Sequence, residues 1–117
     1  GVVYNASYFR YLERARTEWL RARGIDHNQV RADEGIVLVL VSTEVKFLKP
    51  ARLDDMLFIT ANLAELKGAR FVFDQRVHRE SEDGELLCKG VAVVACMDAE
   101  RRKPRRISAK LLSELTE

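Results

Sequence analysis

The chain has 117 residues, of which 47% are hydrophobic and 32% are charged, and its net charge is +2. This length suits one domain over residues 1–117, and the small net charge does not predict nucleic-acid binding. The longest unbroken apolar run, Ile36 to Val41, is far shorter than the roughly 20 residues of a membrane span. The sequence shows no signal-peptide pattern of charged start, apolar stretch and cleavage site.

The chain contains two cysteines, Cys88 and Cys96, which fall in one predicted strand. In a straight strand they would lie about 26 Å apart, so they cannot form a disulfide with each other. We expect two free, buried thiols, and unpaired thiols favour a reducing compartment such as the cytoplasm.

An amphipathic helix is predicted over residues 6–23. Tyr8, Leu12, Ala15 and Trp19 recur at the spacing of one helix face. Asn5 or Ser7 can cap its start, because a short polar side chain accepts a hydrogen bond from a free N–H of the first turn. Gly24 suits the left-handed residue that often follows a helix.

Residues from the end of this helix to about 98 are predicted as strands. Apolar and polar residues alternate from Val41 to Phe47, and Pro50 ends that strand because it cannot donate a ladder hydrogen bond. Further strands share the alternation, with turns at 67–70 and 81–84, the latter carrying an Asp-Gly signal. The apolar residues predicted to share a face are Leu57, Ile59, Ala61 and Leu63, then Phe71, Phe73 and Val77.

The last predicted strand, Leu86 to Met97, presents one face made of small or apolar residues. These residues are Cys88, Gly90, Ala92, Val94 and Cys96. A face of this kind predicts that another element packs closely on it. Short connections favour an antiparallel sheet, and the long helix must bury its apolar stripe on that sheet. A short helix from Ser108 is expected to place Leu111, Leu112 and Leu115 together.

Several kinds of site are not predicted. No Gly-rich loop has the spacing of a nucleotide-binding turn. His27 and His78 lack the spacing of zinc ligands, so no metal is expected. No serine lies in a nucleophile elbow, and no Cys–His pair is indicated.

Two segments resemble a known family. The first runs Gly1-Val2-Val3-Tyr4-Asn5-Ala6-Ser7-Tyr8-Phe9 and continues through Leu12-Glu13-Arg14-Ala15-Arg16-Thr17-Glu18-Trp19-Leu20, and the second is Phe47-Leu48-Lys49-Pro50-Ala51-Arg52-Leu53-Asp54-Asp55. Together they resemble the 4-hydroxybenzoyl-CoA thioesterase branch of hotdog proteins, and within it the Tol-Pal-associated acyl-CoA thioesterases. The similarity covers nearly the whole chain.

The resemblance implies an α+β hotdog fold, in which an antiparallel sheet of about five strands wraps one long central helix. It implies hydrolysis of an acyl-CoA thioester to a free acid and CoA, without metal or organic cofactor. The thioester carbonyl would lie at the start of the helix, where free N–H groups and the helix dipole favour an oxyanion. Carried over by position, the donor is the backbone N–H of Asn5.

The chain departs from the family pattern in two ways. The family's acidic nucleophile or base would lie three positions before Gly1, and a first strand would precede it, so we expect both to be missing from the given N-terminus. The Tol-Pal-associated branch usually has His where this chain has Asn5, and an amide does not titrate near neutral pH.

Further residues are candidates for contacting the substrate. The resemblance places Gly1, Tyr4 and Tyr8 at the helix opening, where the tyrosines either line the acyl pocket or belong to the core. Lys67 and Arg70 flank a turn that lies near the CoA phosphates in the family, and the alternative is that both are simply solvated. Glu13 and Glu18 are expected to be ion-paired surface residues. The arginine-rich run at residues 101–106 is either a solvated basic tail or a clamp for CoA phosphates.

The main alternative function is a catalytically weak or silent hotdog protein that binds acyl-CoA or acyl carrier protein. An acyl-carrier-protein dehydratase is a third reading, but no His and acid face the predicted thioester position. A homo-oligomer, either dimer or tetramer, is expected because the apolar surface exceeds what one small sheet buries.

Overall fold

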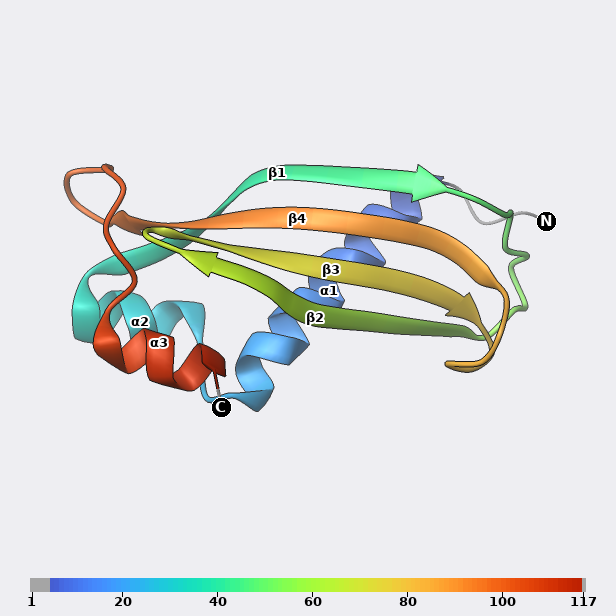
Figure 1. The fold of residues 1–117 in the computed structure, drawn as a ribbon, viewed down its shortest axis with the longest axis horizontal. Coiled ribbons are helices and arrows are strands. Elements are labelled where there is room, and N and C mark those ends of the chain that lie inside the picture. Colours follow the sequence, from blue (N-terminus) through green and yellow to red (C-terminus); the bar gives the residue numbers. More distant parts are fainter. Residues whose placement is uncertain (1–4, 117) are drawn as a thin grey trace.

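The computed structural model describes residues 5–116 as one antiparallel sheet crossed on one face by a long helix (Figure 1). The elements are α1 (Asn5–Ala22), α2 (His27–Glu34), β1 (Ile36–Phe47), β2 (Leu57–Lys67), β3 (Arg70–Arg79), β4 (Leu86–Asp98) and α3 (Ala109–Thr116). The strand order is β1-β4-β3-β2, and every neighbouring pair is antiparallel. The described residues thus form four strands, and the expectation of about five was wrong for this part of the chain.

Helix α1 confirms the predicted long helix, with a buried face that includes one unexpected residue. Tyr8, Leu12 and Leu20 are buried as the periodicity predicts, while Trp19 is only partly buried. Arg16 is also buried, with 8% of its surface exposed. A charged side chain on the inner face requires a polar partner in the sheet, and that partner is described below.

The segment after α1 was expected to be extended, and this was wrong. Residues His27–Glu34 form α2, whose first turn is capped by the Asp26 carboxylate, which accepts from the N–H groups of Asn28 and Gln29 at 2.9 and 3.1 Å. Gly35 ends the helix in the left-handed conformation at φ 65°. Both are standard helix boundary signals.

The small-residue face of β4 packs against α1, as predicted. Cys88, Ala92 and Cys96 are almost fully buried on that face. A Cβ built on Gly90 would lie only 3.3 Å from Leu12 Cδ1, so a side chain there would push against the helix. The glycine therefore allows α1 to lie close to the sheet.

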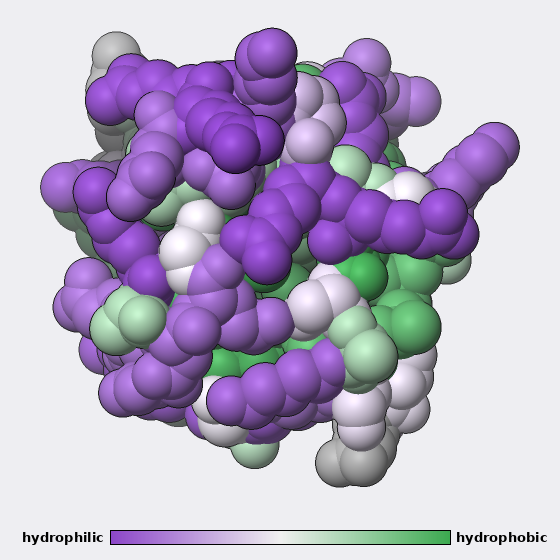
Figure 2. Space-filling model, turned by 90° about the vertical axis from the view of Figure 1, so that its left-hand side faces the viewer, coloured by the Kyte–Doolittle hydropathy of each residue, from purple (hydrophilic) through white to green (hydrophobic). Residues whose placement is uncertain are grey.

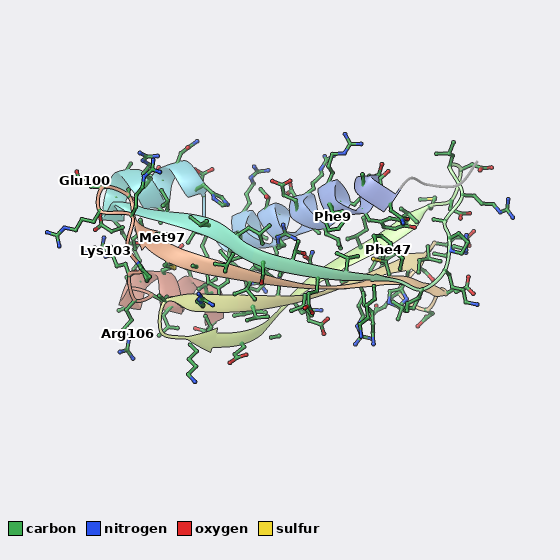
Figure 3. The ribbon with its side chains drawn as sticks, turned by 90° about the horizontal axis from the view of Figure 1, so that it is seen from above. Phe9, Phe47, Met97, Glu100, Lys103 and Arg106 are labelled. Atoms are coloured by element: carbon green, nitrogen blue, oxygen red, sulfur yellow. The ribbon has the colours of Figure 1, made fainter. Side chains whose placement is uncertain are left out.

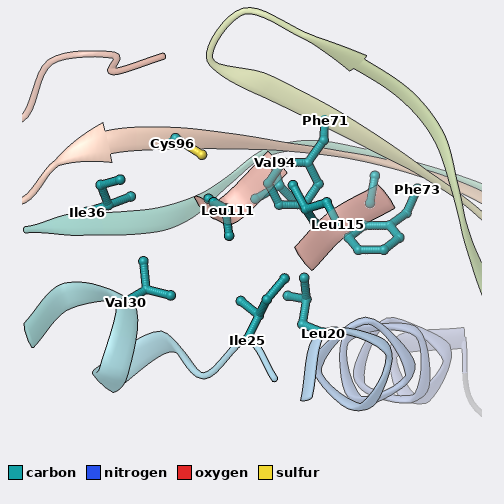
Figure 4. Packing of buried hydrophobic residues seen from close by; sticks show 11 residues of the cluster. Leu20, Ile25, Val30, Ile36, Phe71, Phe73, Val94, Cys96, Leu111 and Leu115 are labelled. Carbon is teal, nitrogen blue, oxygen red and sulfur yellow. The ribbon is translucent and has the colours of Figure 1, made fainter. Parts of the chain in front are cut away.

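The core consists of two clusters placed at the two ends of α1. The larger cluster lies where α2 and α3 close the sheet (Figure 4) and contains Leu20, Ile25, Val30, Ile36, Phe71, Phe73, Ala92, Val94, Cys96, Leu111 and Leu115. The smaller cluster lies near the start of α1 and contains Tyr8, Leu12, Ala51, Val77, Leu87 and Cys88. In α3, Leu112 is 42% exposed, so it does not join Leu111 and Leu115 as expected.

The two cysteines are free and buried, as predicted. Burial raises the pKa of each thiol to about 11, so both are protonated near neutral pH. They act as small apolar core residues.

Candidate active site

The two segments that carry the family resemblance come together at one end of the sheet. Ala51, in the loop after β1, is fully buried in the same cluster as Tyr8 of α1. Phe47 at the end of β1 contacts the ring of Tyr8 edge-on, with centroids 5.5 Å apart. It also lies edge-on to Phe9, with centroids 6.3 Å apart (Figure 3). The loop of residues 48–56 therefore lies beside the start of α1, although more than 40 residues separate these segments.

Asn5 is the first residue of α1, and its side chain is exposed. The first N–H groups of a helix have no intrahelical acceptor, and the helix dipole places partial positive charge there. No acidic residue lies in the first turn, so no carboxylate of the helix itself offsets that charge. The start of α1 is thus suited to a developing negative charge. The other two predicted contacts, Gly1 and Tyr4, lie outside the described residues.

Tyr8 is a core residue whose hydroxyl is left without a partner among the described residues. The residue is 2% exposed, and its ring belongs to the smaller cluster. Burial raises the pKa of its phenol, with Cys88 adding to the effect, so the hydroxyl is a neutral donor near pH 7. Tyr8 is thus a buried aromatic of the smaller cluster, and its role in lining an acyl pocket stays a prediction.

Arg79 ties the 48–56 loop to the β3–β4 hairpin. Its guanidinium donates to the Asp55 carboxylate, to the Pro50 carbonyl at 3.1 Å and to Glu85 Oε1 at 3.2 Å. Asp55 also accepts from the Arg52 N–H at 2.8 Å. That backbone hydrogen bond, together with Arg79, lowers the pKa of Asp55, so its carboxylate is ionised near neutral pH.

Sequence reasoning missed Arg79. It lies just before the predicted turn at 81–84, where an arginine is ordinarily solvated, and nothing in the local pattern distinguishes it. Its ion-pair partner Asp55 did carry a sequence signal. Asp55 follows Pro50 and Arg52 in a loop whose composition favours hydrogen bonds from side chains to the backbone.

Lys67 and Arg70 lie at the opposite end of the sheet from Asn5. They flank the β2–β3 turn and are exposed. Arg70 is level with Ala95 of β4, whereas Phe47, beside the start of α1, is level with Cys88. Seven residues of strand correspond to about 23 Å. One chain therefore does not bring these cations to the helix start.

The basic run at residues 101–106 is an ordered turn rather than a loose tail. Lys103 accepts from the Asp98 N–H at 2.8 Å through its carbonyl, and Arg105 Nη1 donates to the Glu34 carbonyl at 2.6 Å. This turn also lies far from the start of α1 (Figure 3). Figure 2 faces this end of the molecule and shows a mainly hydrophilic surface.

The described residues 5–116 contain no group of three or more His, Cys, Asp or Glu side chains arranged to hold a metal ion. Within the same residues, no helix is long and apolar enough to cross a membrane.

A long helix on an antiparallel sheet, with the exposed helix start beside the loop of residues 48–56, is the hotdog-like α+β architecture that the resemblance implied. A family model described as the Thioesterase-like superfamily matches residues 1–115. The chain belongs to this superfamily.

Individual relatives agree with this assignment. The acyl-CoA thioester hydrolase YbgC of Escherichia coli O6:H1 is 37% identical over 97% of this chain and 83% of its own length. The crystal structure of YbaW, a probable thioesterase from Escherichia coli, matches with a TM-score of 0.83 and 28% identity over 97% of this chain and 84% of its own. A 4-hydroxybenzoyl CoA thioesterase mutant complexed with 4-hydroxybenzoyl CoA gives a TM-score of 0.86 at 25% identity over 98% and 86%. The prediction of a thioester hydrolase is thereby confirmed.

Proposed function

We propose that the protein hydrolyses an acyl-CoA thioester to a free acid and CoA, and that it polarises the thioester carbonyl with the backbone N–H of Asn5. The observation that carries the proposal is the start of α1, which is exposed, free of acidic residues and held beside the second family segment. An N–H fixed in this way stabilises an oxyanion better than water does, because it need not reorient during the reaction.

The proposed hydrolysis uses water and groups of the protein, without a metal or organic cofactor. A water oxygen bonds to the thioester carbon, the carbonyl electrons move to the oxygen held by the Asn5 N–H, and a base takes the water proton. When the carbonyl re-forms, the C–S bond breaks and the CoA thiolate takes up a proton.

A second candidate is a silent protein that binds acyl-CoA or acyl carrier protein without hydrolysis. We assign the chain to the Tol-Pal-associated branch by its motifs. This branch usually has a titratable His where the chain has Asn5, and the absence of that His favours the silent protein. Steady-state release of CoA from short and long acyl-CoA thioesters separates the candidates, because a silent binder gives saturable binding and releases no free CoA thiol.

The two free cysteine thiols support a reducing, cytoplasmic location for the protein.

We also propose a homodimer joined through the free edge of β1. Val39, Leu40 and Val41 are each 38–46% exposed on this edge strand, an arrangement that proteins ordinarily avoid because it invites strand pairing. A two-fold axis normal to the sheet at the middle of β1 would pair two copies antiparallel. It would bring the β2–β3 turn end of one copy to the helix-start end of the other.

The dimer predicts a clear change in mass. The parent chain is expected to run as a dimer or tetramer in light scattering at micromolar concentration, and the Val39→Lys/Val41→Lys variant as a species half that size or smaller, because lysines on an edge strand oppose pairing. A parent of monomeric mass would contradict the proposal.

If the second copy supplies Lys67 and Arg70 to the CoA phosphates, the Lys67→Ala/Arg70→Ala variant should raise KM roughly tenfold and leave kcat nearly unchanged. A contact that stabilises the bound substrate and the transition state equally changes KM and not kcat when it is removed. The control is Arg76→Ala/Lys89→Ala, which removes two exposed cations from the sheet. Equal KM values for both variants and the parent would exclude this role.

A further inference from the structure

The loop of residues 48–56 has few means of holding its position by apolar packing alone. Ala51 is fully buried, but Leu53 and Met56 are 72% and 74% exposed and Leu48 is 47% exposed. A loop with one small anchor and several exposed apolar residues would open readily unless polar contacts held it.

Backbone hydrogen bonds tie the two ends of the loop: the N–H groups of Leu48 and Lys49 donate to the Leu87 carbonyl at 2.9 and 3.2 Å, and the Glu80 N–H donates to the Met56 carbonyl at 2.7 Å. Between these ends, the side-chain contacts of the loop converge on one residue. Arg79 lies at the end of β3 and reaches Asp55, the Pro50 carbonyl and Glu85 at once. The side chains of Arg79 and Asp55 are only 27% and 18% exposed, so this ion pair is better shielded than the other ion pairs among residues 5–116. Both ends of the loop segment 50–55 are therefore attached to the same guanidinium.

The loop in turn bears on the start of α1. Ala51 and Tyr8 belong to one buried cluster, and Tyr8 lies one turn after Asn5. The Tyr8 hydroxyl makes no hydrogen bond of ordinary geometry among the described residues, but the Ala51 backbone lies close enough to the phenol to oppose the rise in its pKa that burial causes, so the ring and the loop meet at Ala51. Movement of the loop would remove the packing of Ala51 against Tyr8, which helps to fix the first turn of the helix.

We propose that Arg79 is a positioning residue for thioester hydrolysis: through Asp55 and the Pro50 carbonyl it holds the 48–56 loop against Tyr8, and so fixes the N–H groups at the start of α1. Arg79 does not contact the substrate in this scheme. The proposal rests on the proposed function, because the quantity that it controls is the placement of the Asn5 donor. A misplacement of about 1 Å in such a site can cost 100-fold in rate.

The test compares Arg79→Met, Arg79→Lys and Asp55→Asn with the parent. Arg79→Met keeps the length of the side chain and removes the three donated hydrogen bonds, so kcat is expected to fall roughly tenfold with KM changed less than about threefold. Arg79→Lys keeps the charge without the planar fork and should recover part of kcat. Asp55→Asn removes the charge of this pair but leaves the Arg79 bonds to Pro50 and Glu85, so its kcat should fall less than that of Arg79→Met. The double variant should lose no more than Arg79→Met alone, because both residues act through one unit.

Arg76→Met is the matched control. Arg76 is on the same strand and pairs with Asp74 at 4.0 Å, with both side chains about half exposed. Its kcat is expected to stay within about twofold of the parent, since exposed ion pairs contribute little.

Hydrogen exchange supplies a readout that does not depend on activity. In Arg79→Met, peptides covering 48–56 and 5–12 should both exchange faster, while peptides in the larger core cluster should keep the parent rate. Faster exchange of the loop alone, or parent kcat in folded Arg79→Met and Asp55→Asn, would overturn the proposal. If Arg79→Met does not fold, Asp55→Asn decides the outcome. An inactive parent would refute the proposed function, while the exchange pattern would still decide whether Arg79 controls the start of α1.

Discussion

Asn5→Pro is expected to lower kcat roughly 100-fold, the scale on which loss of one oxyanion donor acts. Proline has no backbone N–H, so the substitution removes the proposed donor. Proline is accepted in the first turn of a helix, and Asn5 is exposed at the first position of α1, so the fold should survive. Circular dichroism checks the helix, and CoA release from short acyl-CoA thioesters measures kcat.

Two companion variants separate the backbone from the side chain. Asn5→Ala keeps the N–H and should change kcat by at most a few-fold, because the exposed side chain is not the proposed donor. Asn5→His introduces the residue usual in the Tol-Pal-associated branch, and a large gain in turnover would show that the side chain takes part. A folded Asn5→Pro protein that works at the parent rate would refute the assignment of the donor.

Gln75→Leu is expected to lower the free energy of unfolding by about 3 kcal/mol, because it leaves a buried guanidinium without its acceptor. Arg16 Nη1 donates to Gln75 Oε1 at 2.9 Å, and Gln75 Nε2 donates to the Leu12 carbonyl at 2.9 Å. Gln75 is 1% exposed and Arg16 is 8% exposed, so water replaces neither bond easily. Burial also lowers the pKa of Arg16, which is consistent with a charge held at some cost inside the fold.

Thermal and urea unfolding measure this effect, which corresponds to a fall in Tm of about 10 °C for a domain of this size. The Arg16→Met/Gln75→Leu variant should be more stable than Gln75→Leu alone, since removing both polar partners costs less than leaving one unpaired. Asn62→Leu, on the exposed face of β2, is the control and should change stability by less than about 0.5 kcal/mol. A Gln75→Leu protein as stable as that control would show that Arg16 needs no acceptor.

The sequence alone determined the elements whose pattern is local. The stripe through Tyr8 and Leu12 predicted α1, because side chains one helical turn apart share a face. The alternation in β2, β3 and β4 predicted which residues would face the helix, because successive strand residues point to opposite faces. The small-residue face at Gly90 also predicted close packing, and the two family segments predicted the thioesterase class before any geometry was known.

The tertiary structure decided everything that depends on contacts distant in the sequence. The buried Arg16 was hidden in a helix rich in arginine, since only the register of Gln75 on β3 shows which one turns inward. Arg79 was likewise indistinguishable from solvated arginines until β3 placed it beside Asp55. Helix α2 was missed although Asp26 and Gly35 mark its ends, because its single buried residue, Val30, leaves almost no apolar period to detect.

The arrangement of the predicted site was also a tertiary result. The motifs indicated that Asn5, Lys67 and Arg70 could serve one substrate, but the strand register places the two cations at the far end of the sheet from Asn5. Local sequence patterns report which face a residue occupies and not how far along the sheet it lies. That distance depends on strand pairing between residues far apart in the chain, which no local periodicity encodes.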